Sequence, residues 1–381
     1  MFYPAELLTW TESVSRHLPQ LSKSQAKMLA WYSFAVSVVQ GCGISQVACY
    51  LSELFGQQEE TVRQRMRESL YDAGDKRGRH RREIDPILCF VPLFKWIVSH
   101  WISEDEKLFL GLDATTLRQT FTVLSISVLV GRCAIPVAWT VLPANQAGEW
   151  QSHWKGLLQA LRLSSQPFSV LVLADRGLYA KWLFDEIVVC GWHPLLLIND
   201  QGNVCIRATG QRLKLSQLAQ LCRNKQWQGE VACFSGTGRL HCSLLIVWDE
   251  EQKNPWLLVT DLPLFQVSPS WYVLRMWIEA GFKFLKSAAF HWERTRMKNP
   301  ARVERLWLVL ALATLRLALL APSPAPLPFG SYPRLSLFKR ALIRQLAFLT
   351  LAHPLPFFPL FFNPLPPSPY LDFLHLLNTY P

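Results

Sequence analysis

The sequence lacks closely paired cysteines. Its nine cysteines are scattered along 381 residues, their number is odd, and no two of them form a C-x-x-C pair. A zinc knuckle needs cysteines at such short spacing, and a disulfide framework uses cysteines in pairs. The sequence therefore predicts neither, and we expect these cysteines to be reduced thiols in the core of a cytosolic protein.

A signal peptide and a long uncharged apolar run are also missing. The first twenty residues carry acidic side chains and have no basic segment leading into an apolar stretch, so we expect the chain to stay in the cytoplasm. The most apolar run, residues 306–321, is short for a membrane span and contains Arg316. This run is predicted to be a buried helix of a soluble core.

Acidic residues are fewer than basic ones. The chain has 28 Asp and Glu against 39 Lys and Arg, which gives a formal net charge of +11. This surplus suits a polyanion such as DNA, and binding through it would weaken as salt is added. A generically basic protein, or one attracted to anionic lipid, has the same balance, so charge alone does not identify the partner.

Residues 1–106 are predicted to be mostly helical, because apolar residues recur at spacings of three and four. Two of the expected helices join at Gly56 and resemble a helix-turn-helix of the kind that enters a DNA groove. The second of them, from about Glu60 to Tyr71, carries Arg63, Arg65 and Arg67. An ordinary helical hairpin with a solvated basic face fits the same pattern.

A basic loop, residues 73–85, follows these helices. It carries Lys76, Arg77, Arg79, Arg81 and Arg82 around two glycines. Several cations on a flexible loop can each settle against a phosphate, so we expect Arg79, Arg81 and Arg82 to bind DNA. A disordered polar linker is the alternative.

Two aspartates follow strand-like runs further along the chain. Asp113 ends the apolar part of LFLGLDATTL, and Asp175 ends that of FSVLVLADRGLY. In an α/β sheet, side chains at the carboxyl ends of strands face the crevice in which ligands bind. Taken singly, either aspartate could be an ordinary turn residue or helix cap.

A third acidic residue lies in the stretch YVLRMWIEAGFKFLK. Tyr272, Arg275, Glu279 and Lys286 follow one another at offsets of three, four and seven, which keeps them close to one face of a predicted helix. A solvated helix face with an Arg275–Glu279 pair has the same spacing. Glu293 is a rival third acid, but Glu279 alone is in register with the other three residues.

Together these residues resemble the DDE transposases of bacterial insertion sequences, in the branch called insertion-sequence family four. The resemblance covers roughly residues 107–315, and its signature Tyr-x2-Arg-x3-Glu-x6-Lys is complete. It implies an α/β fold with an RNase H-like (retroviral-integrase-like) mixed sheet, a β-rich insertion before the glutamate, and cut-and-paste DNA transposition.

The resemblance also implies roles for the residues. Asp113, Asp175 and Glu279 would be catalytic and would hold two Mg²⁺ ions, with Mn²⁺ as a substitute, while Tyr272, Arg275 and Lys286 would bind DNA. The partners it implies are double-stranded DNA, as terminal inverted repeats and target, and a second copy of the chain on paired ends. No membrane is implied, and the site of action would be the bacterial nucleoid.

Five regions are predicted on this basis. They are a helical DNA-binding region (1–106), the first part of the core (107–199), an inserted β subdomain (200–262), the second part of the core with the signature helix (263–321) and a Pro-rich tail (322–381). Proline at the density seen in the tail is expected to break helices and central strands.

Two other functions fit the same residues. A domesticated nuclease on this fold would cut DNA without joining strands, and a decayed copy would bind DNA without chemistry. Short inverted repeats flanking the gene would favour the transposase over both.

Overall fold

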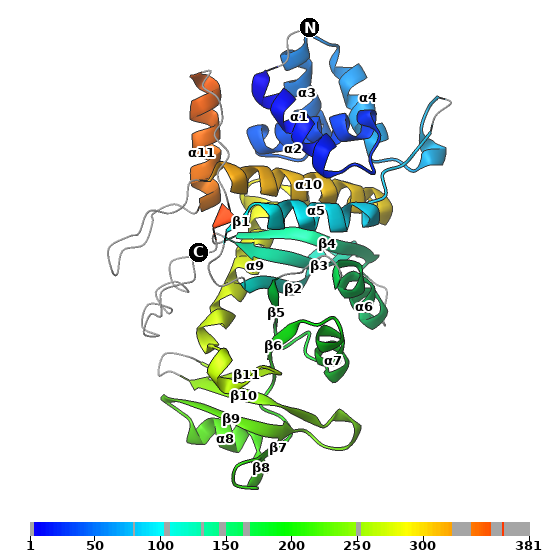
Figure 1. The fold of residues 1–381 in the computed structure, drawn as a ribbon. Helices are drawn as coiled ribbons and strands as arrows, with labels where there is room; N and C mark the ends of the chain where they lie inside the picture. Colours follow the sequence, from blue (N-terminus) through cyan, green and yellow to red (C-terminus); the bar gives the residue numbers. More distant parts are fainter. Residues whose placement is uncertain are drawn as a thin grey trace. The chain divides into compact units, whose positions relative to one another are not determined.

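The structure is a computed structural model that describes residues 4–78, 81–102, 107–130, 133–144, 150–162, 168–248, 253–321, 337–351 and 360–361 (Figure 1). It divides into two compact units. The first unit comprises Met1–Glu104, Ala114–Glu149 and Trp277–Phe362, and the second comprises Asp105–Asp113, Trp150–Met276 and Asn363–Pro381. Each unit thus combines segments that are far apart in the sequence.

Helices dominate the N-terminal part of the first unit, as predicted. They are α1 (Ala5–His17), α2 (Lys23–Val39), α3 (Ile44–Phe55), α4 (Glu59–Ser69) and α5 (Ile87–Ser99). Ser22 caps α2 in a capping box with Gln25. Gly56 ends α3 in the left-handed region, at φ 60°, where a glycine has no Cβ to clash. The predicted joint at Gly56 is confirmed.

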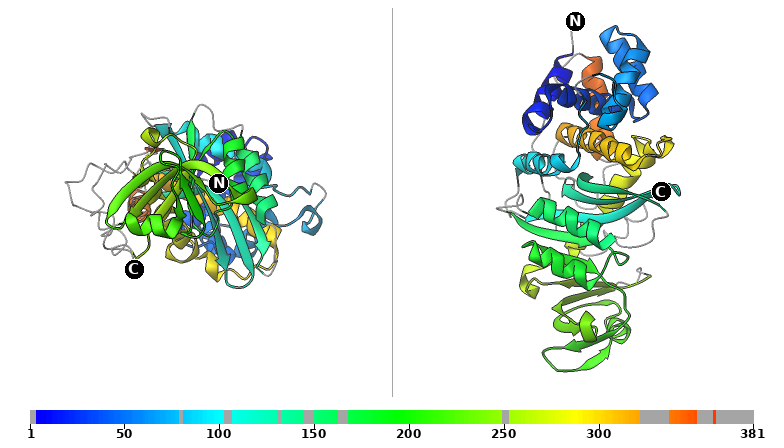
Figure 2. Two further views of the ribbon diagram at one scale, coloured as in Figure 1. Left: turned by 90° about the horizontal axis from the view of Figure 1, so that it is seen from below. Right: turned by 90° about the vertical axis from the view of Figure 1, so that its right-hand side faces the viewer.

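Helix α10 (Pro300–Leu320) is the buried centre of the first unit. Asn299 caps it, and it packs on α2 and on strand β4 (Cys133–Pro143), as Figure 2 also shows. Nearly all its residues from Val303 onward are buried, which confirms the buried helix predicted at 306–321. No single described helix is long and apolar enough to cross a membrane, although α2 and α3, bent by 101°, pass that test as a pair.

The Pro-rich tail contains a helix that was not predicted from the sequence. Helix α11 (Leu337–Thr350) forms where fourteen residues contain no proline. It packs on α2 and α10, and its Gln345 donates from Nε2 to the carbonyl of Ser37 at 2.9 Å. Apart from this helix, Leu351 and strand β12 (Leu360–Phe361), the tail lies outside the described residues.

Strands β3 (Phe121–Val130) and β4 form an antiparallel pair in the first unit. The connection between them, residues 131–132, lies outside the described residues. Strand β4 is at the edge of its sheet, and Glu304 of α10 covers part of that edge. The Glu304 carboxylate accepts from the Val141 amide at 2.9 Å and from the Thr140 hydroxyl at 3.2 Å. Burial raises the pKa of Glu304 above its usual value.

The second unit is built on a mixed sheet. Its strands are β2 (Lys107–Leu117), which continues into the first unit at Ala114, β5 (Ser169–Ala174), β6 (His193–Leu197), β7 (Asn203–Ile206), β8 (Arg212–Lys214), β9 (Lys225–Cys233), β10 (Leu240–Trp248) and β11 (Trp256–Thr260). Their order is β2-β5-β6-β11-β10-β9-β7-β8. Strands β2, β5 and β6 are parallel, and α6 (Trp150–Leu161) and α7 (Lys181–Val189) precede β5 and β6 in the chain. Helix and strand thus alternate from α6 to β6.

The predicted β-rich insertion continues the sheet of the core. Its last strand, β11, pairs antiparallel with β6, so that Leu258 lies opposite Leu197 and Val259 opposite Leu196. The insertion also contains a helix that was not predicted, α8 (Leu215–Leu221). Residues 203–260 are therefore joined to the core by backbone hydrogen bonds as well as by the chain.

Candidate active site

The two predicted aspartates lie at neighbouring positions on parallel strands. Strands β2 and β5 pair in register up to Leu112 and Ala174, and Asp113 and Asp175 are the next residues on each. Asp175 follows the end of β5, as expected. Asp113 does not end its strand, because β2 continues to Leu117, but it is the first residue beyond the pairing with β5.

Arg275 joins these aspartates. Its Nη2 atom lies 3.3 Å from Oδ2 of Asp113 and 3.2 Å from Oδ2 of Asp175. The side chains of Arg275 and Asp113 are each 15% exposed, and that of Asp175 is 35% exposed. Two carboxylates this close would repel each other, and the guanidinium between them offsets that repulsion.

The turn after β5 fixes the orientation of Asp175. Its Oδ1 atom accepts a hydrogen bond from the backbone amide of Leu178 at 3.1 Å. Gly177 allows this close fold, because a Cβ at that position would lie 3.3 Å from the same oxygen. One carboxylate oxygen is thus held by the turn, and the other points to Arg275.

Tyr272 holds the segment that carries Arg275. It is 4% exposed, its hydroxyl donates to the carbonyl of Ala174 at 3.2 Å, and the Trp256 ring meets it edge to face at 5.2 Å. These contacts place Tyr272 as a support for the segment that carries Arg275. The expected DNA-binding role of Tyr272 stays a prediction.

The signature segment is not one regular α-helix, so that prediction was wrong. It consists of the 3₁₀ helix η5 (Pro269–Arg275), helix α9 (Met276–Lys283) and a π-helical turn, η6 (Phe284–Ala288). These three geometries turn by different angles per residue, so the spacing does not keep its members on one face. Tyr272 is buried, Glu279 is exposed and Lys286 is half-buried.

The unit boundary falls within this segment. Tyr272 and Arg275 belong to the second unit together with Asp113 and Asp175, and the structure brings these four residues together. Glu279 and Lys286 belong to the first unit.

The two aspartates supply ligand atoms that suit a divalent cation. Within the described ranges, no three His, Cys, Asp or Glu side chains are gathered as a metal site. Asp113 and Asp175 nevertheless offer hard carboxylate oxygens, the donors that Mg²⁺ prefers, and they already share one cationic group. The chemistry of this pair fits the expected ion.

The predicted DNA-binding arginines of the basic loop are only in part described. Arg81 and Arg82 are exposed, and Arg81 donates from Nε to the carbonyl of Gly78 at 2.6 Å. Arg79 lies outside the described residues.

A mixed α/β sheet of this kind is compatible with an RNase H-like DDE domain. The family model described as Transposase DDE domain matches residues 141–316, somewhat less than half of the chain. The match supports a DDE transposase, and with it a nuclease or transesterase role. It includes Asp175, Arg275 and Glu279 and begins after Asp113. No curated protein matches the chain.

Two parts of the site were not predicted from the sequence. The carbonyl of Ala174 and the ring of Trp256 hold Tyr272, although they come from two different strands. The position of Ala174 directly before Asp175 is the signal that could have pointed to the first. Trp256 carries no such signal, because the chain has sixteen tryptophans.

Proposed function

We propose that this protein is a transposase of insertion-sequence family four that cuts DNA at the ends of its element and joins those ends to a new site. The observation that carries the proposal is the contact of Arg275 with both Asp113 and Asp175. Arg275 is the second member of the Tyr-x2-Arg-x3-Glu-x6-Lys signature, so two independent sequence patterns meet at one place.

Asp113, Asp175 and Glu279 are the proposed metal ligands. Divalent ions held there, Mg²⁺ or Mn²⁺, would activate the attacking oxygen and stabilise the leaving oxygen of a phosphodiester. The protein's own part is to hold the carboxylates in place. The turn at Leu178 orients Asp175, and the pairing of β2 with β5 sets Asp113 beside it.

Arg275 and Lys286 are the proposed phosphate contacts near the scissile bond. The guanidinium has a planar fork of donors that can bind a phosphate through two hydrogen bonds, just as it binds carboxylates. Tyr272 keeps η5 against the end of β5 and thereby keeps Arg275 beside the aspartates.

The proposed partner is double-stranded DNA, as element ends and as target, bound by a homodimer in the cytoplasm. The net charge of +11 supports a polyanionic partner. Arg79, Arg81 and Arg82 are proposed to contact its backbone, outside the catalytic site.

Single substitutions of the three acids test the proposal. Asp113→Asn, Asp175→Asn and Glu279→Gln should each abolish Mg²⁺-dependent strand cleavage and leave binding of duplex DNA largely intact. Glu293→Gln, which changes the rival acid, is the matched control and should retain cleavage. Full activity in any of the first three variants would remove that residue from the site.

The wild-type products separate this proposal from its alternatives. Cleavage followed by joining to a target plasmid supports a transposase. Cleavage without joining would indicate a nuclease, and binding without either would indicate a DNA-binding remnant.

A further inference from the structure

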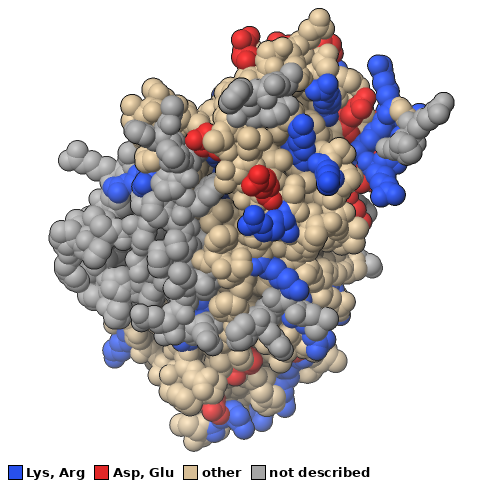
Figure 3. Space-filling model, turned by 45° about the horizontal axis from the view of Figure 1, so that its top comes forward, with Lys and Arg blue, Asp and Glu red and all other residues tan. Residues whose placement is uncertain are grey.

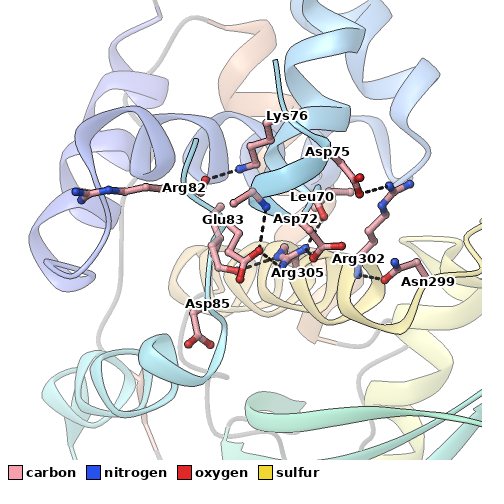
Figure 4. Close-up of polar contacts among 12 residues, drawn as sticks. Leu70, Asp72, Asp75, Lys76, Arg82, Glu83, Asp85, Asn299, Arg302 and Arg305 are labelled. Carbon is pink, nitrogen blue, oxygen red and sulfur yellow. Dashed lines mark hydrogen bonds and ion pairs between the residues drawn. The ribbon is translucent and has the colours of Figure 1, made fainter. Parts of the chain in front are cut away.

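Arg305 of helix α10 bonds to residues just before the basic loop and to residues at the C-terminal end of the loop (Figure 4). Although charged, it is only 5% exposed. Its Nε atom donates to the carbonyl of Ile84 at 2.8 Å, and its Nη1 atom donates to the carbonyl of Leu70 at 3.0 Å and to Asp72 at 2.8 Å. Its Nη2 atom lies 3.4 Å from the Glu83 carboxylate. One guanidinium thus ties both ends of the loop to one helix.

Arg302, one turn earlier on α10, makes a second attachment. Its Nη2 atom donates to Asp75 at 3.0 Å, and its guanidinium lies 4.0 Å from the centre of the Tyr71 ring. The backbone amide of Arg302 is itself held by Asn299, the cap of α10. Because Asn299 fixes the start of this helix, the attachment is to a defined point on a buried element.

Glu83 makes further hydrogen bonds that hold the loop. Glu83 accepts from the backbone amide of Ala73 at 3.0 Å, and the Glu83 carbonyl accepts from Gln25 of α2 at 2.9 Å. Asp72, Asp75 and Glu83 all have an arginine of α10 as a partner. Their negative charge is therefore offset on the side that faces the protein.

Three described arginines of the loop lie on its outer side. Arg77, Arg81 and Arg82 are exposed, and Figure 4 shows the Arg82 side chain extending away from Arg305. Lys76 supports this arrangement by donating to the carbonyl of Arg82 at 2.6 Å. On the face seen in Figure 3, Lys and Arg side chains gather towards the upper right, with fewer Asp and Glu among them.

We infer that Arg302 and Arg305 are positioning residues that hold Arg77, Arg81 and Arg82 as a fixed basic edge, and that this edge docks on the phosphate backbone of duplex DNA. The inference rests on the proposed function for its partner and goes beyond it in two respects. It assigns two arginines of helix α10 to the support of the loop. It also holds that the described residues of the loop, 73–78 and 81–85, keep their positions before DNA arrives.

Fixing the cations in advance favours binding in two ways. Side chains on an ordered backbone lose less conformational freedom when they meet phosphates. Acids that already bond to Arg302 and Arg305 repel an approaching phosphate less than free carboxylates would. Removing Arg305 frees Asp72 and Glu83, so it should weaken DNA binding although the Arg305 side chain itself is too buried to reach DNA.

Binding of a fluorescent duplex to the full chain, measured over a range of salt concentrations, tests the docking edge. Each phosphate contact contributes about 0.9 to the slope of log affinity against log salt. Replacing Arg77, Arg81 and Arg82 together by Gln should lower the slope by up to about 2.7. The matched control replaces three exposed arginines of the second unit, Arg207, Arg223 and Arg239, by Gln. Equal slopes in the two triple variants would overturn the inference.

A double-mutant cycle tests the positioning role. Arg305→Lys should weaken duplex binding several-fold in the wild-type background and have no further effect in the loop triple variant, because the edge it positions is then absent. A purely structural role would lower affinity equally in both backgrounds. Arg302→Gln changes a partly exposed pair, so it should fold even if Arg305→Lys does not, and the same pattern is expected with a smaller effect.

Limited proteolysis gives a readout independent of affinity. Trypsin should cut after Arg81 or Arg82 faster in Arg302→Gln than in the wild type, and duplex DNA should protect the wild-type loop. Protection by anionic phospholipid vesicles but not by duplex would identify a membrane surface as the partner and overturn the inference.

Failure of the inference can be told from failure of the proposed function. If the wild type cleaves and joins DNA while the loop triple variant binds duplex normally, only the inference fails. If loop-dependent duplex binding persists but no variant or condition yields cleavage, only the proposed function fails.

Discussion

Arg275→Gln is the most informative perturbation of the candidate site. It removes the guanidinium that bonds both Asp113 and Asp175 and leaves two carboxylates in mutual repulsion. Removing one partner of a fully buried ion pair costs about 3–5 kcal/mol. Because Asp175 is 35% exposed and water screens it, we expect the free energy of unfolding without divalent ions to fall by only about 1–3 kcal/mol.

Adding Mg²⁺ should reverse part of this loss. In the wild type an ion must compete with the guanidinium for the same carboxylates, whereas in Arg275→Gln it does not. If the ion binds tenfold more tightly to the variant, its stabilising effect at high Mg²⁺ is larger by about 1.4 kcal/mol. Urea unfolding at a series of Mg²⁺ concentrations measures this difference, and isothermal calorimetry measures the affinity directly.

Arg176→Gln is the matched control, because it removes the same charge next to Asp175 from an exposed position. It should show the wild-type response to Mg²⁺. The reasoning is refuted if Arg275→Gln and the wild type gain equal stability from Mg²⁺. It is also refuted if that gain survives in the Asp113→Asn/Asp175→Asn double variant.

Two further predictions concern the supports of the fold and the site. The raised pKa of Glu304 means that its ionised form is disfavoured in the folded state. The contribution of Glu304 to stability is therefore largest below the pKa of the unfolded state and is lost as the pH rises through the higher pKa of the folded state. Glu304→Gln keeps an acceptor for the Val141 amide, so its free energy of unfolding should depend less on pH between about pH 4 and 7 than that of the wild type. Glu304→Ala should lower the free energy of unfolding by about 1–3 kcal/mol, because it leaves that backbone amide unsatisfied. Identical pH profiles for Glu304→Gln and the wild type would contradict this prediction. Tyr272→Phe loses the hydrogen bond to the Ala174 carbonyl, so the free energy of unfolding should fall by about 0.5–1.5 kcal/mol. Strand cleavage should become slower while the affinity for DNA stays unchanged. A loss of DNA affinity at unchanged stability would instead make Tyr272 a DNA contact.

Local patterns in the sequence predicted much of the architecture. The apolar runs around Asp113 and Asp175 became β2 and β5, the helical spacing of the first hundred residues became α1 to α5, and Gly56 ended α3. These features depend on neighbouring residues or on residues a few positions apart. Such strands, helices and helix ends can therefore be predicted from a short window of sequence.

The parts that could not be predicted depend on contacts between distant segments. The partners of Arg302 and Arg305 are one example, because the acids that engage these arginines are more than two hundred residues earlier in the chain. In the same way, the three helical geometries of residues 269–288 differ from the single α-helix that their spacing suggests. Helix α11 formed because local sequence without proline matters more than the composition of the whole tail.

The pairing of β11 with β6 limits how this protein can be shortened. An inserted subdomain that is attached only through its two linkers can be deleted to give a shorter enzyme for crystallography or delivery. Here deletion of residues 203–260 would remove β11, the strand that pairs with β6. The backbone amides and carbonyls of β6 on that side would then be unpaired, and such an exposed strand edge promotes self-association. Any minimised version should therefore retain at least β11 or replace it with a substitute strand.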